Sequence, residues 1–178
     1  MEGFNGCPLS RTATNLVFSD GYNEAKLMLI GDMPDAEDDK LGIPFKGEAG
    51  ALLNKMLAAI NHNRDNTYLT NLVFWRPPGG RVASKEEISI CLPFVKKHIS
   101  IINPKVLVLV GSTVAKTILD SEIGITQLRG KWKNVSFDDN KSYVKTISIF
   151  HPAFLIKQPT RKIEAWKDLQ SISNSFNN

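Results

Sequence analysis

The sequence predicts an α/β protein: a three-layer α/β/α sandwich around a central, mostly parallel four-stranded sheet. Four short runs of apolar, strand-favouring residues lie along the 178-residue chain, and segments with helical periodicity separate them. Strands that alternate with helices form parallel sheets that carry helices on both faces. The predicted strands are residues 26–32, 67–72, 106–111 and 144–150.

The helices are predicted between these runs and after the last one. Residues 50–62 have one apolar face at helical spacing, and Ser84 forms a capping box with Glu87 ahead of a second such face. This second helix must end before Asn103, because Pro104 disfavours a helical residue ahead of it. The predicted helices are residues 50–62, 85–102, 112 or 113 to about 119, and about 160 to 173.

The remaining segments complete the organisation. Residues 132–137 and 143–149 flank the polar turn 138–141 and can pair as a hairpin that adds an antiparallel strand. No internal repeat and no linker divides the sequence. We therefore expect one domain over residues 1–178, with an N-terminal segment at 1–25 and a frayed tail at 174–178.

Composition narrows the classes of protein that remain. Hydrophobic residues make up 42% and charged residues 22%, which is typical of a globular protein. No apolar run reaches the roughly 20 residues of a membrane span, and the first residues lack the apolar stretch of a signal peptide, so we expect a cytoplasmic protein. The net charge of +4 fits a polyanionic partner without requiring one. The two cysteines, Cys7 and Cys91, are too few for a four-thiolate metal site, and we expect no disulfide between them.

A loop with polar or aromatic residues follows each predicted strand. The carboxyl ends of parallel strands meet at one edge of a sheet, so these loops should lie together. Asp32 follows the first strand, Asn71 the second and His151 the fourth, and Phe45 lies in the long loop after the first. Loops on a rigid scaffold commonly carry function. Taken singly, each of these residues also has a plain structural interpretation: a turn cap, a surface histidine or a core plug. For the acidic run at 35–39, a solvated loop is expected. His62 and His98 lie on predicted helices and are expected at the surface.

Several motifs then occur in a fixed order. Gly-x-Pro-Phe-x-Gly-x-Ala-Gly is matched at 42–50, Thr-Asn with a following Arg-Pro-Pro at 70–78, and His-Pro-Ala-aromatic-Leu at 151–155. Residues 31–39 align with Gly-Glu-Ala-Pro-Gly-x-x-Glu-Asp, and 129–132 with Arg-Gly-x-Trp. In these motifs the chain resembles the uracil-DNA glycosylase superfamily, in particular its family 4, which is also described as related to the DNA polymerase of phage SPO1. The resemblance covers nearly the whole sequence.

This resemblance implies a monofunctional DNA N-glycosylase of base-excision repair, which flips uracil out of DNA and hydrolyses its N-glycosidic bond. Phe45 would stack on the base, and the amide of Asn71 would read its Watson–Crick edge. His151 would donate a hydrogen bond to the uracil oxygen as charge develops there. Asp32 would orient or deprotonate the attacking water, with help from the backbone around Met33 and Pro34.

The same resemblance predicts the contacts with uracil-containing DNA. Leu155 is predicted to wedge into the duplex where the base leaves, because apolar side chains inserted between base steps are a general device. Backbone N–H groups at Ser112 and Thr113 are predicted to hold a phosphate at a helix start. The side chains predicted to hold the DNA backbone further out are Lys46, Arg76, Arg81 and Lys157. We expect a monomer, because DNA must reach an open sheet edge.

The sequence departs from the family at the iron–sulfur cluster that family members usually hold on four cysteines. Cys7 and Cys91 occupy two of those positions, and Phe4 and Trp75 occupy the other two. Two thiolates are too few, so we predict that this protein has no cluster and uses no metal or other cofactor.

Other departures lie in the expected pocket. Asp32 replaces a glutamate and shortens the reach of the carboxylate, Met33 replaces a small residue, Asp35 replaces a glycine, and Gly80 replaces an asparagine. These changes keep two alternatives open: a glycosylase for another deaminated or mismatched base, such as hypoxanthine or thymine opposite guanine, and a DNA-binding protein without turnover. A third alternative, a binder of small nucleotides, is permitted by the sheet architecture alone. A covalent-trapping branch of the superfamily is excluded, because residues 82–90 contain no histidine.

Overall fold

Four parallel strands form the centre of the sheet in the computed structural model, which describes residue 4, residues 6–137 and residues 143–176. They lie in the order β3-β2-β4-β6, which confirms the predicted parallel centre. Each lies within one or two residues of its predicted bounds. The four strands are β2 (Leu27–Gly31), β3 (Thr67–Asn71), β4 (Val106–Val110) and β6 (Tyr143–Ile149).

Two antiparallel strands extend this centre at its edges, so the sheet has six strands and the predicted number of four was wrong. β5 (Trp132–Ser136) pairs with β6 as the expected hairpin, and the predicted turn at 138–141 lies outside the described residues. β1 (Ser19–Gly21) pairs with β3 inside the segment expected to be a plain N-terminal extension. Three residues are too few to show a pattern in the sequence.

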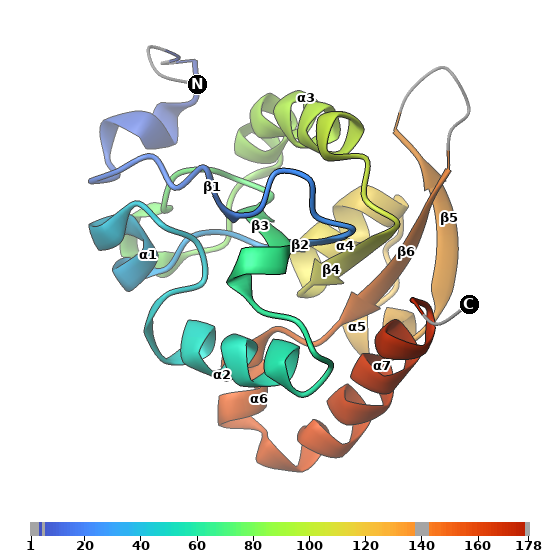
Figure 1. Cartoon of the computed structure of the whole chain (residues 1–178). Helices are drawn as coiled ribbons and strands as arrows, with labels where there is room; N and C mark the ends of the chain where they lie inside the picture. The colour runs from blue at the N-terminus through green and yellow to red at the C-terminus, as the bar shows by residue number, and fades with distance from the viewer. Residues whose placement is uncertain (1–3, 5, 138–142, 177–178) are drawn as a thin grey trace.

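Helices cover both faces of the sheet, as predicted (Figure 1). Because successive side chains of a strand point to opposite faces, Leu107 and Leu109 of β4 pack with one apolar cluster, and Val108 packs with the other. The first cluster includes α3 (Lys85–Ile102) and α4 (Ser112–Leu119). The second includes α2 (Gly47–Ala58), α6 (Pro152–Lys157) and α7 (Lys162–Asn174).

A local signal explains where the longest described helix begins. The side chain of Ser84 accepts a hydrogen bond from the Glu87 N–H, and Glu87 returns one to the Ser84 N–H, so the predicted capping box starts α3. α2 begins three residues ahead of the predicted start, and α7 ends at Asn174. The shorter helical segments are α5 (Ile125–Leu128), η1 (Pro8–Arg11), η2 (Arg64–Asn66), η3 (Pro78–Gly80) and η4 (Pro159–Arg161). Among the described residues, no helix is long and apolar enough to cross a membrane.

The acidic run expected to be a solvated loop is a helix, α1 (Ala36–Leu41). The Asp35 carboxylate caps its first turn, and Asp38 completes a capping box. Asp38 and Asp39 are buried. Asp39 accepts hydrogen bonds from the backbone N–H groups of residues 14 and 15, which ties the N-terminal segment to α1. The spacing of the two capping aspartates was the signal for this helix in the sequence.

The C-terminal tail and two histidines are more buried than predicted, because of tertiary packing. The tail does not fray through residue 176: Ser175 is buried, and Phe176 packs against the cluster beneath α7. Residues 177–178 lie outside the described residues. His62 is half-buried, and His98, also expected at the surface, is only 8% exposed and sits edge-on to Phe18.

Candidate active site

The strand ends converge as the sequence predicted. In the sheet register, Gly31 lies beside both Asn71 and Val110, and Val110 lies beside Ile149. The loops that follow these residues therefore leave the sheet at one edge. This brings Asp32, Asn71 and the segment that begins at His151 to the same end of the molecule.

Asn71 and Phe45 meet over Gly31. A Cβ atom at Gly31 would collide with the amide oxygen of Asn71 and with Cζ of the Phe45 ring, so only glycine leaves room for both. Asn71 is 1% exposed and Phe45 is 3% exposed. The Nδ2 atom of Asn71 is buried without a hydrogen-bond partner in the described structure. An unpaired buried donor is costly, so this amide has a hydrogen bond left to make.

His151 caps the short helix α6, and its ring lies beside that of Phe45. Its Nδ1 atom accepts a hydrogen bond from the Ala153 N–H at 3.2 Å, which leaves the proton of the neutral ring on Nε2. Burial lowers the pKa of His151 to about 4, against a smaller raising effect of Asp35. The ring is therefore neutral near pH 7. Its centroid lies 6.0 Å from that of the Phe45 ring, and the planes are 24° from parallel.

Asp32 binds the start of α4. Its Oδ1 atom accepts a hydrogen bond from the Val114 N–H at 2.8 Å, and the N–H groups of Ser112 and Thr113 also stabilise the charged carboxylate. Burial outweighs these bonds and raises the pKa of Asp32 to about 6. The N–H groups predicted to hold a phosphate thus stabilise Asp32 in this structure, and the phosphate contact stays a prediction.

Asp38, which was not predicted as a site residue, holds the loop between Asp32 and α1 through a hydrogen bond from the Asp35 N–H. Met33 is half-exposed and packs against the core, while Pro34 is buried. Asp38 accepts a hydrogen bond from the Lys46 N–H at 2.6 Å and thereby ties α1 to the Phe45 loop. Burial raises the pKa of Asp38 to about 6. The aspartate repeat at positions 35 and 38 was its only signal in the sequence.

Comparison with known proteins identifies the family to which this arrangement belongs. Residues 18–170 match the model of the uracil-DNA glycosylase superfamily. The chain belongs to this superfamily. It is 34% identical to the type-4 uracil-DNA glycosylase of Thermotoga maritima over 88% of its own length and 80% of that protein. It is 35% identical to the Archaeoglobus fulgidus protein of the same name, over 93% and 84% of the two chains. With the type-4 enzyme of Sulfurisphaera tokodaii it shares 35% identity over 94% and 79%.

Leu155, the residue predicted to wedge into the duplex, is buried. Leu155 is 1% exposed and packs in the cluster beneath α2 and α7, so the prediction that it wedges into the duplex was wrong for this conformation. Its neighbour Phe154 is 36% exposed, and its ring lies 4.9 Å from that of Phe150. In a helix, adjacent residues face different directions, which a motif alone does not resolve.

The predicted basic contacts differ in their surroundings. Lys157 is exposed at the end of α6, and the side chain of Lys46 is half-exposed at the start of α2. Arg81 is exposed but forms a two-bond pair with Glu87, at 2.8 and 2.6 Å. Arg76 is half-buried, and its Nε atom has no hydrogen-bond partner among the described residues. This nitrogen therefore has a hydrogen bond left to make.

The residues at the expected cluster position do not fit a four-thiolate iron–sulfur cluster. Cys7 and Cys91 are free and fully buried, and burial raises the pKa of Cys91 to about 12. Phe4 and Trp75 pack beside them with ring centroids 6.3 Å apart. Across residues 4, 6–137 and 143–176, no group of three or more His, Cys, Asp or Glu residues is placed to hold a metal ion. Near the expected cluster position, the described residues therefore offer two buried thiols beside two aromatic rings.

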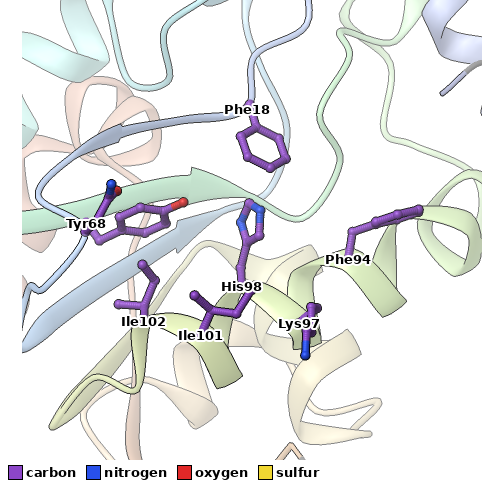
Figure 2. Close-up of a pocket in the computed structure, with 8 residues that line it drawn as sticks. Phe18, Tyr68, Phe94, Lys97, His98, Ile101 and Ile102 are labelled. Carbon is purple, nitrogen blue, oxygen red and sulfur yellow. The ribbon is translucent and has the colours of Figure 1, made fainter. Parts of the chain in front are cut away.

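A cavity of about 440 Å³ is lined mainly by residues of α3, and Figure 2 shows its lining side chains. Phe18, Tyr68 and His98 line it, together with Phe94 and Lys97, which precede His98 in α3. It shares no residue with the site at the strand ends.

Proposed function

We propose that this protein is a monofunctional uracil-DNA glycosylase of base-excision repair, which removes uracil from DNA and leaves an abasic site. The observation that carries the proposal is the convergence of Phe45, Asn71 and His151 at one sheet edge, with a buried and unpaired amide donor among them. The names of the relatives support it.

The three side chains suit the recognition of a flipped uracil. Nδ2 of Asn71 donates to the uracil O4, and its Oδ1 accepts from the N3–H. Cytosine presents the opposite pattern of donor and acceptor at this edge, so a fixed amide rejects it. The Phe45 ring supplies the flat apolar face on which the base stacks.

The same edge carries the groups for bond cleavage. As the bond between the base nitrogen and the sugar carbon breaks, negative charge grows on the base, and the neutral His151 donates to the uracil O2 from Nε2. A water molecule attacks the sugar carbon. Asp32 either orients this water or accepts its proton, and the departing base takes up a proton from solvent.

DNA is held around this pocket by exposed groups. Phe154 replaces Leu155 as the proposed wedge, because it is the exposed large apolar residue of α6. Lys46, Arg76 and Lys157 contact phosphates, and Arg81 does so once it leaves Glu87. The proposed enzyme acts as a monomer and contains neither an iron–sulfur cluster nor a catalytic metal.

Base release tests the proposal. The purified protein is incubated with labelled single-stranded DNA and with duplexes that carry uracil opposite guanine or adenine, hypoxanthine, or thymine opposite guanine. We expect release of uracil from the uracil substrates. If only a base other than uracil is released, the protein is a glycosylase for that base. If the protein binds DNA and releases no base, it is a DNA-binding protein without turnover.

A further inference from the structure

Arg64 lies outside the pocket but holds the backbone that presents Phe45. It belongs to η2, immediately before β3, and its side chain is 17% exposed. Its guanidinium donates to the backbone carbonyl of Phe45 and, at 3.1 Å, to that of Pro44. It also forms an ion pair with Asp20 and donates to Asn54 of α2 at 3.0 Å. One side chain thus connects β1, α2 and the Phe45 loop.

The backbone at Phe45 needs such support. Phe45 has a φ of 55°, in the left-handed region that bulky residues rarely adopt. Its carbonyl also lies against Gly50, where an added Cβ would collide with it. On the other side, the N–H of Lys46 is held by Asp38 at 2.6 Å. The strained residue therefore persists because hydrogen bonds on both sides fix it, as is common where strain serves a site.

We propose that Arg64 is a positioning residue for uracil, which fixes the Phe45 ring at the angle needed to stack on the flipped base. Charged donors make stronger hydrogen bonds than neutral ones, and a planar guanidinium reaches two neighbouring carbonyls at once. Asp20 keeps the guanidinium in place and balances its charge. Arg64 touches neither base nor sugar, so its effect passes through Phe45.

This inference rests on the proposed function and predicts a loss in excision rate with little loss in DNA binding. A displacement of about 1 Å in a reacting group can cost on the order of 100-fold in rate. We expect Arg64→Gln to lower the single-turnover rate of uracil release by about 10- to 100-fold. Arg64→Lys, which keeps the charge but not the planar fork, should recover part of the rate. Binding to uracil-free DNA should stay within about twofold.

A double-mutant cycle with Phe45→Ala separates positioning from a general effect on folding, and the exposed Arg11→Gln is the control for the lost charge. If Arg64 acts through Phe45, Arg64→Gln costs much less in the Phe45→Ala background than in the wild type. If Arg64→Gln does not fold, the same cycle is measured with Arg64→Lys and Asp20→Asn. Losses that multiply fully, or a wild-type rate for the Arg64 variants, would overturn the inference. Absence of release by the wild type would instead overturn the proposed function.

Discussion

The Nδ1 atom of His151 accepts a hydrogen bond from the Ala153 N–H, 3.2 Å away, at the first turn of α6. This bond fixes which nitrogen of the ring carries the proton, and burial keeps the ring neutral by lowering its pKa to about 4. One interaction therefore caps a helix and also leaves Nε2 as the N–H donor of the ring, the atom that the proposed mechanism uses. The two roles can be separated by mutation.

His151→Asn should retain the helix cap and lose the donor. Asparagine is a good N-cap residue, but its side chain is too short to reach the position of Nε2. Because removal of one donor to a developing oxyanion costs on the order of 100- to 1000-fold, we expect a loss of this size in the single-turnover rate. The melting temperature should stay close to that of the wild type. A near-normal rate in a folded His151→Asn variant would exclude this role.

The rate of uracil release should depend on pH through Asp32. Burial raises the pKa of Asp32 to about 6, so the active carboxylate is lost as the pH falls below that value. The rate should fall about tenfold for each unit below pH 6 and level off above it. His151 adds no second inflection between pH 5 and 8, because its pKa is about 4. The pKa of Asp38 is also raised to about 6, so the profile is repeated with Asp38→Asn, which should leave the inflection in place.

Ionisation of Asp32 should also lower the free energy of unfolding of the protein. Its folded pKa of about 6 exceeds the ordinary 3.8, so the folded protein binds more protons than the unfolded chain between these values. The contribution of Asp32 to stability therefore falls as the pH rises through this window. Asp32→Asn, whose amide oxygen can still accept from Val114, should lose activity and melt at the same or a higher temperature at pH 7. A clear drop in melting temperature would show that the carboxylate mainly supports α4.

Phe154 and Leu155 should respond to mutation in opposite ways. Leu155→Ala removes a buried side chain and should lower the free energy of unfolding by about 2–5 kcal/mol. Phe154→Ala should leave stability nearly unchanged and reduce uracil release from duplex DNA more than from single strands, because only a duplex needs a wedge. Equal losses on both substrates would argue against a wedge at Phe154.

The protein should release uracil without iron bound at Cys7 and Cys91. We expect the purified protein to be colourless, with iron and acid-labile sulfide far below one cluster per chain. Cys91→Ala should retain uracil release, and its effect should be limited to packing, since the thiol is fully buried. Stoichiometric iron together with loss of activity in Cys91→Ala would contradict this account.

Patterns within strands were predictable, and contacts between distant loops were not. The places of Asn71 and His151 followed from their positions at strand ends, because a parallel sheet brings those ends together. The burial of Leu155 depends on the direction of a short helix, and the bond of Asp32 to α4 joins residues 82 positions apart. Arg64 left no signal because its partners come from three separate segments. Such contacts are set by tertiary geometry rather than by local sequence.

The most direct test of the central claim is uracil release by Asn71→Ala. This variant removes the unpaired amide from the pocket, and Asn134→Ala on the exposed strand β5 is the matched control. We predict a single-turnover rate lower by at least about 100-fold, because the hydrogen bonds to the base are lost, with folding and binding to uracil-free DNA retained. A folded Asn71→Ala variant that releases uracil at the wild-type rate would contradict the proposal that this edge of the sheet reads the base.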